Sequence, residues 1–192
     1  MPARPPPPCC RRFPLADRQF AVLLSRINVG GNRLKMAELK AALEVARFAG
    51  VQTIAASGNV LLESRLAPGA ISQTIARLLQ AEFGIECIAA VLTRVELEAV
   101  LAKCPFADGE PKKVHVLFCD GAVRKEAVAQ LRAEHAARGA ERIEAGDGVL
   151  YVDYVDGVGD SKLTNAWIER RLGCSTTARN VNSLQRILGK MN

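Results

Sequence analysis

Apolar runs and helical spacings follow one another in a regular order through the first half of the chain. They predict a buried strand, a helix, two strands joined by a short turn, a second helix and a closing strand. The segments are FAVLLSRI (20–27), 36–46, VQTIAA (51–56), VLLES (60–64), 68–83 and ECIAAVL (86–92). The turn Ser57-Gly58-Asn59 is typical of a hairpin, because glycine and asparagine tolerate positive φ.

The second half repeats this order with different residues. Its segments are KVHVLFC (113–119), 123–135, ERIEA (141–145), VLYVDY (149–154), 161–172 and CSTTA (174–178). A capping box at Thr93 and Glu96 predicts a connecting helix, and apolar residues from Val181 to Leu188 predict a last helix. The pattern therefore predicts an α+β protein of two tandem ferredoxin-like (βαββαβ) subdomains, over 17–93 and 111–192, joined by a helix and loop over 94–110.

Composition makes this an ordinary globular chain with an excess of positive charge. It has 192 residues, 49% of them hydrophobic and only 5% aromatic, with a net charge of +6. Part of that charge lies in a Pro/Arg-rich tail, residues 1–16, which we expect to be disordered. The remaining positive charge is concentrated over 160–192, where it either attracts an anionic partner or forms a solvated face. Nucleic acid is the weaker candidate for that partner, because the predicted central strands lack stacking aromatic residues.

Cysteine and histidine usage argues against disulfide and metal chemistry. The six cysteines form no CxxC pair and fall partly in apolar runs, so we expect reduced thiols in a cytoplasmic protein. Neither of the two histidines has a cysteine or carboxylate at metal-ligand spacing, so no metal is predicted. No nucleotide-binding fingerprint is present, and no cofactor is expected. No segment is long and apolar enough to span a membrane, so no membrane partner is expected.

The first candidate site lies after the first predicted strand. In a βαββαβ unit, the loop after strand one and the hairpin between strands two and three share one end of the sheet. This brings Asn28, Gly30 and Gly31 beside Ser57 and Asn59, so that amides, a hydroxyl and a glycine backbone could bind a polar or anionic ligand. The alternative is structural: the glycines permit a turn while the asparagines cap backbone groups.

The second candidate site joins two segments near the C-terminus. The loop after the third strand of the second unit lies near the end of its fourth strand, and a helix capped by Asp160 or Ser161 begins there. The residues that could hold an anion are Ser161, Lys162, Thr164, Asn165, Arg179, Asn180 and Asn182. Here too the alternative is structural, a capped helix whose basic residues are solvated or paired with Asp156 and Asp160.

Three functions remain open. The leading hypothesis is a protein that binds an anionic small molecule or a phosphate-containing ligand through its glycine-rich loops. The second is a small-substrate enzyme, a transferase or hydrolase without metal, in which Ser57 or Ser161 acts with Lys162. The third is an assembly or interaction module; the oligomeric state is left open. The carboxylates Asp153 and Asp156 are expected to be surface residues.

Four ordered motifs carry a resemblance to a known family. They are LLSRINVGGNRLKMAELKAAL, SGNVLLES, GDSKLTNAWIERRLG and TTARNVN. Together they resemble the bacterial DUF1697 family, a domain of unknown function whose members begin near an RGINVGG motif. The match runs from about Gln19 to Lys190. The resemblance implies a cytoplasmic protein of two α+β subdomains with no established activity, and it implies that 28–31, 57–59, 161–165 and 177–182 are signature segments.

The chain departs from that family pattern at three places. Ser25 and Arg26 stand where the family typically has Arg-Gly, Ala56 stands for a glutamine, and Val181 stands for an aromatic residue. An arginine displaced by one position along a strand points to the other face of the sheet. The resemblance therefore implies that any ligand site of the family would bind differently here.

Overall fold

The computed structural model of the chain describes residues 18–28 and 33–192. Its first half contains β1 (Arg18–Leu24), α1 (Met36–Val45), β2 (Ala49–Ile54), β3 (Asn59–Ser64), α2 (Pro68–Phe83) and β4 (Ala89–Leu92). After α3 (Arg94–Ala102), the second half contains β5 (Val114–Cys119), α4 (Lys125–His135), β6 (Arg142–Ala145), β7 (Val149–Asp153), α5 (Asn165–Leu172), β8 (Thr176–Asn180) and α6 (Val181–Leu188). The predicted tail, 1–16, and the candidate site residues Gly30 and Gly31 lie outside the described residues.

The strands form two four-stranded sheets with orders β2-β3-β1-β4 and β6-β7-β5-β8. All neighbouring strands are antiparallel, with Leu23 opposite Asn59 in the first sheet and His115 opposite Asn180 in the second. The α+β class predicted from the sequence is confirmed. The end of β1 adjoins the β2–β3 hairpin, because the Leu24 amide donates to the Gly58 carbonyl at 2.9 Å.

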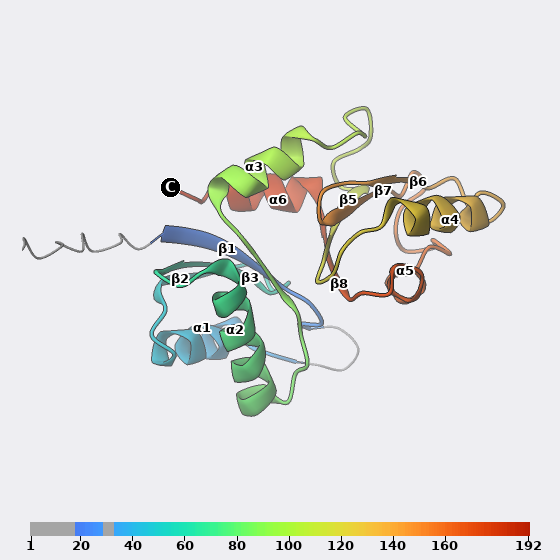
Figure 1. Cartoon of the computed structure of the whole chain (residues 1–192). Helices are drawn as coiled ribbons and strands as arrows, with labels where there is room; N and C mark the ends of the chain where they lie inside the picture. Colours follow the sequence, from blue (N-terminus) through green and yellow to red (C-terminus); the bar gives the residue numbers. More distant parts are fainter. Residues whose placement is uncertain (1–17, 29–32) are drawn as a thin grey trace, which may run out of the picture.

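Each sheet has one face covered by its own helices and one face turned toward a shared central core (Figure 1). The outer core of the first half packs α1 and α2 on their sheet, and that of the second half packs α4 and α5 on theirs. The central core combines residues of both sheets with Leu97 of α3 and Leu184 and Ile187 of α6. The continuous apolar run of β1 follows from this arrangement, because a strand covered on both faces needs no polar side.

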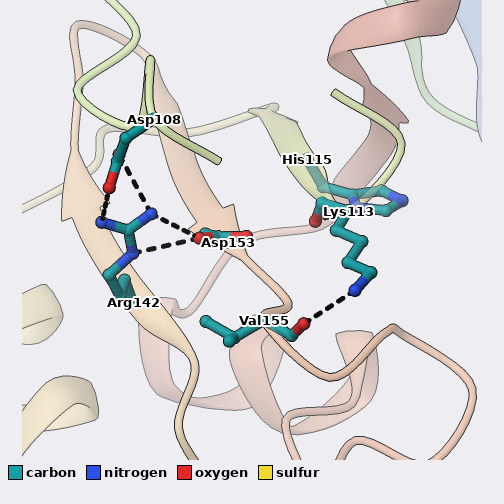
Figure 2. A network of polar contacts seen from close by, with 6 residues as sticks. All are labelled: Asp108, Lys113, His115, Arg142, Asp153 and Val155. Atoms are coloured by element: carbon teal, nitrogen blue, oxygen red, sulfur yellow. Dashed lines mark hydrogen bonds and ion pairs between the residues drawn. The ribbon is translucent and has the colours of Figure 1, made fainter. Parts of the chain in front are cut away.

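A polar network holds the segment between α3 and β5 against the second sheet (Figure 2). Arg142 donates to Asp153 Oδ2 at 2.6 and 3.0 Å and to both carboxylate oxygens of Asp108 at 2.9 and 3.1 Å. Hydrogen bonds to Arg142 lower the pKa of Asp108, and hydrogen bonds to both aspartates raise the pKa of Arg142. The expectation that Asp153 is a surface residue is wrong: it is buried because Arg142 neutralises its carboxylate.

Helix α5 begins later than the sequence predicted. We expected a helix from residue 161, capped by Asp160 or Ser161, with Lys162 in its first turn. Instead Ser161 Oγ accepts the Leu163 amide at 3.0 Å, and Thr164 caps α5 by accepting from the Trp167 amide. Leu163 is buried in the outer core of the second half, which fixes the chain just before Thr164. Lys162 is exposed and precedes the helix.

Three simpler expectations can be compared with the described part of the chain. Its four cysteines are free thiols, its side chains form no cluster that could hold a metal ion, and its helices include none that could cross a membrane. The predicted capping box of Thr93 and Glu96 at the start of α3 is confirmed.

Candidate functional site

Arg179 joins the two halves of the molecule. It lies on β8, the edge strand of the second sheet, opposite Val116, and so points toward the central core and the first sheet. Its Nε donates to Asn59 Oδ1 at 2.5 Å, and Nη2 donates to the carbonyls of Leu24 at 2.8 Å and Ser57 at 2.7 Å. The two loops proposed as separate sites are thus brought together by one guanidinium group.

The hydrogen bonds of Arg179 are all made to neutral acceptors. Nη2 also lies 3.5 Å from the Gly58 carbonyl, and Nη1 donates to Thr177 Oγ1 at 3.0 Å and to the Ala178 carbonyl at 2.8 Å. No carboxylate of residues 18–28 or 33–192 forms an ion pair with it. Burial lowers the pKa of Arg179 to about 10, so the group remains charged at neutral pH. Among the described residues, its charge is solvated by neutral dipoles.

A cavity of about 420 Å³ lies at this junction. The junction cavity follows β8 and is bordered by both halves of the chain. Its lining residues are Leu24, Ser25, Arg26, Ile27, Ser57, His115, Asn165, Glu169, Thr176, Thr177, Ala178, Arg179, Asn180 and Ser183. Because β8 is an edge strand, the cavity can be lined by residues of both its faces, such as Arg179 on one and Asn180 on the other.

Four of the predicted site residues line the junction cavity: Ser57, Asn165, Arg179 and Asn180. A fifth, Asn59, is buried beside it and donates from Nδ2 to Ser57 Oγ at 2.9 Å. Asn59 thereby holds both Arg179 and the serine hydroxyl in place, which makes it a positioning residue of the cavity wall.

The other described candidates lie elsewhere. Asn28 closes its own loop: its side chain accepts from the Leu34 amide and donates to the carbonyls of Leu34 and Ala56. Thr164 caps α5 and is exposed, Lys162 is exposed, and the Asn182 amide donates to the Pro111 carbonyl at 3.1 Å. For Asn28 the contacts match the structural alternative considered from the sequence.

Ser161 belongs to a network away from the junction cavity. Its hydroxyl donates to Glu141, whose other carboxylate oxygen lies 2.6 Å from Nε2 of the buried His135. Desolvation raises the pKa of Glu141, but the hydrogen bonds from Ser161 and His135 outweigh it and leave the pKa below its usual value. A nucleophilic serine must give its proton to a base with matched geometry, whereas this carboxylate holds the loop against α4. Within the described chain no hydrogen bond joins Ser161 to Lys162.

Sequence reasoning missed several residues of the cavity. Among them are His115, Glu169 and Arg26. Glu169 lies four residues after Asn165 and therefore on the same face of α5, so helical spacing could have identified it. His115 is directly opposite Asn180, and this pairing requires the strand register, which the sequence pattern did not supply.

Arg26 is placed by the turn that follows β1 and not by strand alternation. It has φ 57°, a left-handed conformation, and it lies after the last residue of β1. We expected the displaced arginine to point to the other face of the sheet. That expectation does not apply to Arg26, because this residue lies outside β1. A glycine at this position would adopt this conformation without strain. The Arg26 side chain is 52% exposed and lies 4.0 Å from Glu86.

The electrostatics of the junction cavity favour an anion with polar groups. Arg26 and Arg179 contribute positive charge, and Glu169 contributes the negative charge of the lining. The starts of two helices also border it, through Asn165 of α5 and through Ser183 of α6 and its N-cap Asn180. The partial positive charge at helix N-termini adds to the attraction for an anion.

A second cavity of about 410 Å³ lies between β4, α3 and the β6–β7 hairpin. Its charged lining residues are Glu96, Lys103 and Asp147, and Glu96 is engaged in the capping box of α3. None of the residues predicted as ligand contacts lines it. The junction cavity is therefore the stronger candidate site.

Comparison with known proteins gives a family and a fold. The model of the family described as "Protein of unknown function (DUF1697)" matches residues 18–151. The chain is also similar to the solved structure of the conserved bacterial protein SP0830 from Streptococcus pneumoniae, with 21% identity and a TM-score of 0.64 over 91% of this chain and 98% of that one. No curated protein matches the sequence. Since the family model covers more than half of the chain, the protein belongs to the DUF1697 family of proteins of unknown function.

Proposed function

We propose that the protein binds an anionic small molecule, such as a phosphate-containing compound, in the junction cavity. The observation that carries this proposal is the charge of Arg179, which lies in the cavity wall without a carboxylate partner in the described chain. A charge held away from water by neutral dipoles still attracts an anion, because the surrounding protein screens it less than solvent does. Arg26 supplies a second positive charge on the rim.

The remaining lining residues fit a small polar ligand. Ser57, Ser183 and Asn165 offer hydroxyl and amide groups, and the first turns of α5 and α6 add helix-dipole charge. A volume of about 420 Å³ is within the range of small-molecule sites and is too small for a folded partner. We also infer that both halves are ferredoxin-like and that the protein acts in the bacterial cytoplasm, where its thiols stay reduced.

Replacing Arg26 with glutamine should weaken phosphate binding. The change removes one of the two positive charges of the cavity lining but leaves the side chain long enough to reach the rim. We expect the dissociation constant for inorganic phosphate, measured by titration calorimetry at low salt, to rise about three- to tenfold. The loss should shrink as salt is added, since Arg26 is half exposed.

Arg47→Gln is the matched control for this experiment. Arg47 is also an exposed arginine with positive φ, 69°, but it lies between α1 and β2 and does not line the cavity. Its variant should bind phosphate as the unmodified protein does. Equal weakening by both variants would mean that phosphate responds only to net charge, and the proposed site would be wrong.

A small-substrate enzyme is the second candidate function. The observation that favours it is His115 in the junction cavity, since a neutral imidazole beside bound substrate can act as a general base. The serine–lysine pair considered from the sequence offers less support, because Ser161 donates to Glu141.

A further inference from the structure

His115 has a defined orientation beside the junction cavity. Its Nδ1 lies 3.0 Å from the Lys113 carbonyl, and its ring meets Tyr154 edge-on with centroids 5.1 Å apart. Figure 2 shows the imidazole turned away from the Arg142 network. Because a carbonyl only accepts hydrogen bonds, Nδ1 must carry the proton of the neutral ring. Nε2 therefore holds a lone pair and is an acceptor.

Nε2 of His115 is available to a ligand. Nε2 of His115 makes no hydrogen bond within the described chain, and it is not among that chain's buried polar atoms without a partner. It is therefore reached by solvent, and the residue lines the junction cavity. Burial lowers the pKa of His115 although the hydrogen bond to Lys113 opposes this, so the ring is neutral at physiological pH.

Glu169 provides a second acceptor in the same cavity. Its Oε1 accepts from the Thr176 amide at 2.7 Å and from Thr176 Oγ1 at 3.2 Å. No hydrogen bond or ion pair in the described residues occupies Oε2, which is not among their buried unpartnered atoms either. The half-buried carboxylate is thus fixed at one oxygen and open at the other, within a cavity that also holds two arginines.

We propose that the junction cavity selects anions that carry their own hydrogen-bond donors, so that it binds hydrogen phosphate in preference to sulfate. This inference rests on the proposed anion site and specifies its ligand class. Arg26 and Arg179 attract the negative charge, while His115 Nε2 and Glu169 Oε2 each require a ligand O–H or N–H. Sulfate has the same tetrahedral shape but no proton at neutral pH. It would leave both acceptors unpaired and would be repelled by the carboxylate.

The test compares the two anions on the full chain at about pH 7, where phosphate keeps at least one proton and His115 is expected to be neutral. Binding of inorganic phosphate and of sulfate is measured by titration calorimetry at matched ionic strength. We expect phosphate to bind at least about tenfold more tightly, because only phosphate brings donors for both acceptors. A second readout is the imidazole ¹⁵N spectrum, which is simple because the chain has two histidines.

Two variants separate hydrogen-bond acceptance from folding. His115→Phe keeps an aromatic ring against Tyr154 but removes the acceptor, so the preference for phosphate over sulfate should fall several-fold. His115→Gln keeps an acceptor oxygen and should retain most of the preference. Both variants should show far-UV circular dichroism spectra like that of the unmodified chain. In the ¹⁵N spectrum, phosphate should shift Nε2 of His115 and leave His135, which does not line the cavity, unchanged.

The outcomes are distinct. Tighter phosphate binding that depends on His115 supports the inference. Equal affinity for phosphate and sulfate, both weakened by Arg26→Gln, would leave the anion site standing and overturn the selectivity. No binding of either anion and no change in the His115 signals would contradict both the selectivity and the proposed site.

Discussion

Replacing Arg179 with methionine should lower the free energy of unfolding by about 3 kcal/mol, because several neutral acceptors lose their donor at once. Asn59 Oδ1 and the carbonyls of Leu24 and Ser57 all accept from this guanidinium group. Asn59 is buried, so water replaces the lost donor poorly. The measurement is equilibrium unfolding in urea, followed by circular dichroism.

Two further variants show whether the loss comes from the hydrogen bonds. Arg179→Lys keeps the charge but cannot reach all of the acceptors, so its stability should lie between those of the methionine variant and the unmodified chain. Arg77→Met, at an exposed position of α2, should change stability by less than about 0.5 kcal/mol. A loss of under about 1 kcal/mol for Arg179→Met would show that Arg179 does not hold the two halves together.

Replacing Leu97 with alanine should lower the free energy of unfolding by about 3 kcal/mol and should affect both halves together. Leu97 is fully buried in the central core, which both sheets share with α3 and α6, so its removal leaves a cavity at the junction. Trp167, the sole tryptophan, lies in the outer core of the second half and reports on that half alone. Its fluorescence transition should move with the circular dichroism transition of the whole chain.

Val95→Ala is the control on the same helix. Val95 is 72% exposed, so its truncation should change stability by less than about 0.5 kcal/mol. If Leu97→Ala left the Trp167 transition in place while the circular dichroism transition shifted, the two halves would unfold independently and the central core would not unite them.

The sequence pattern predicted the elements well wherever one periodicity dominates. The apolar run of β1 indicated a strand covered on both faces, and its alternate residues do enter two different cores. The turn over 55–58, which contains the predicted Ser57 and Gly58, joins β2 to β3, with Gly58 at φ 72°. The expected βαββαβ order predicted this turn beside the end of β1, and the hydrogen bond from Leu24 to Gly58 confirms that contact.

The candidate site was predicted only in part, because it depends on contacts between the halves. Nothing in the local sequence indicates that Arg179 reaches Asn59, since this pairing requires the two sheets to meet across the central core. The start of α5 was predicted too early because Asp160, Ser161 and Thr164 are all suitable N-cap residues. Leu163 is buried in the core, and the helix begins after it with Thr164 as its N-cap. His115 was missed because its place opposite Asn180 follows from strand register and not from residue type.

We propose that residues from both halves bind one anion in the junction cavity. Backbone amide chemical-shift mapping of the ¹⁵N-labelled chain during a titration with inorganic phosphate tests it most directly. We expect the largest shifts at 25–27 and Ser57 from the first half and at 176–183 from the second, with a common dissociation constant. Shifts confined to one half, or centred on the second cavity at Glu96, Lys103 and Asp147, would contradict it.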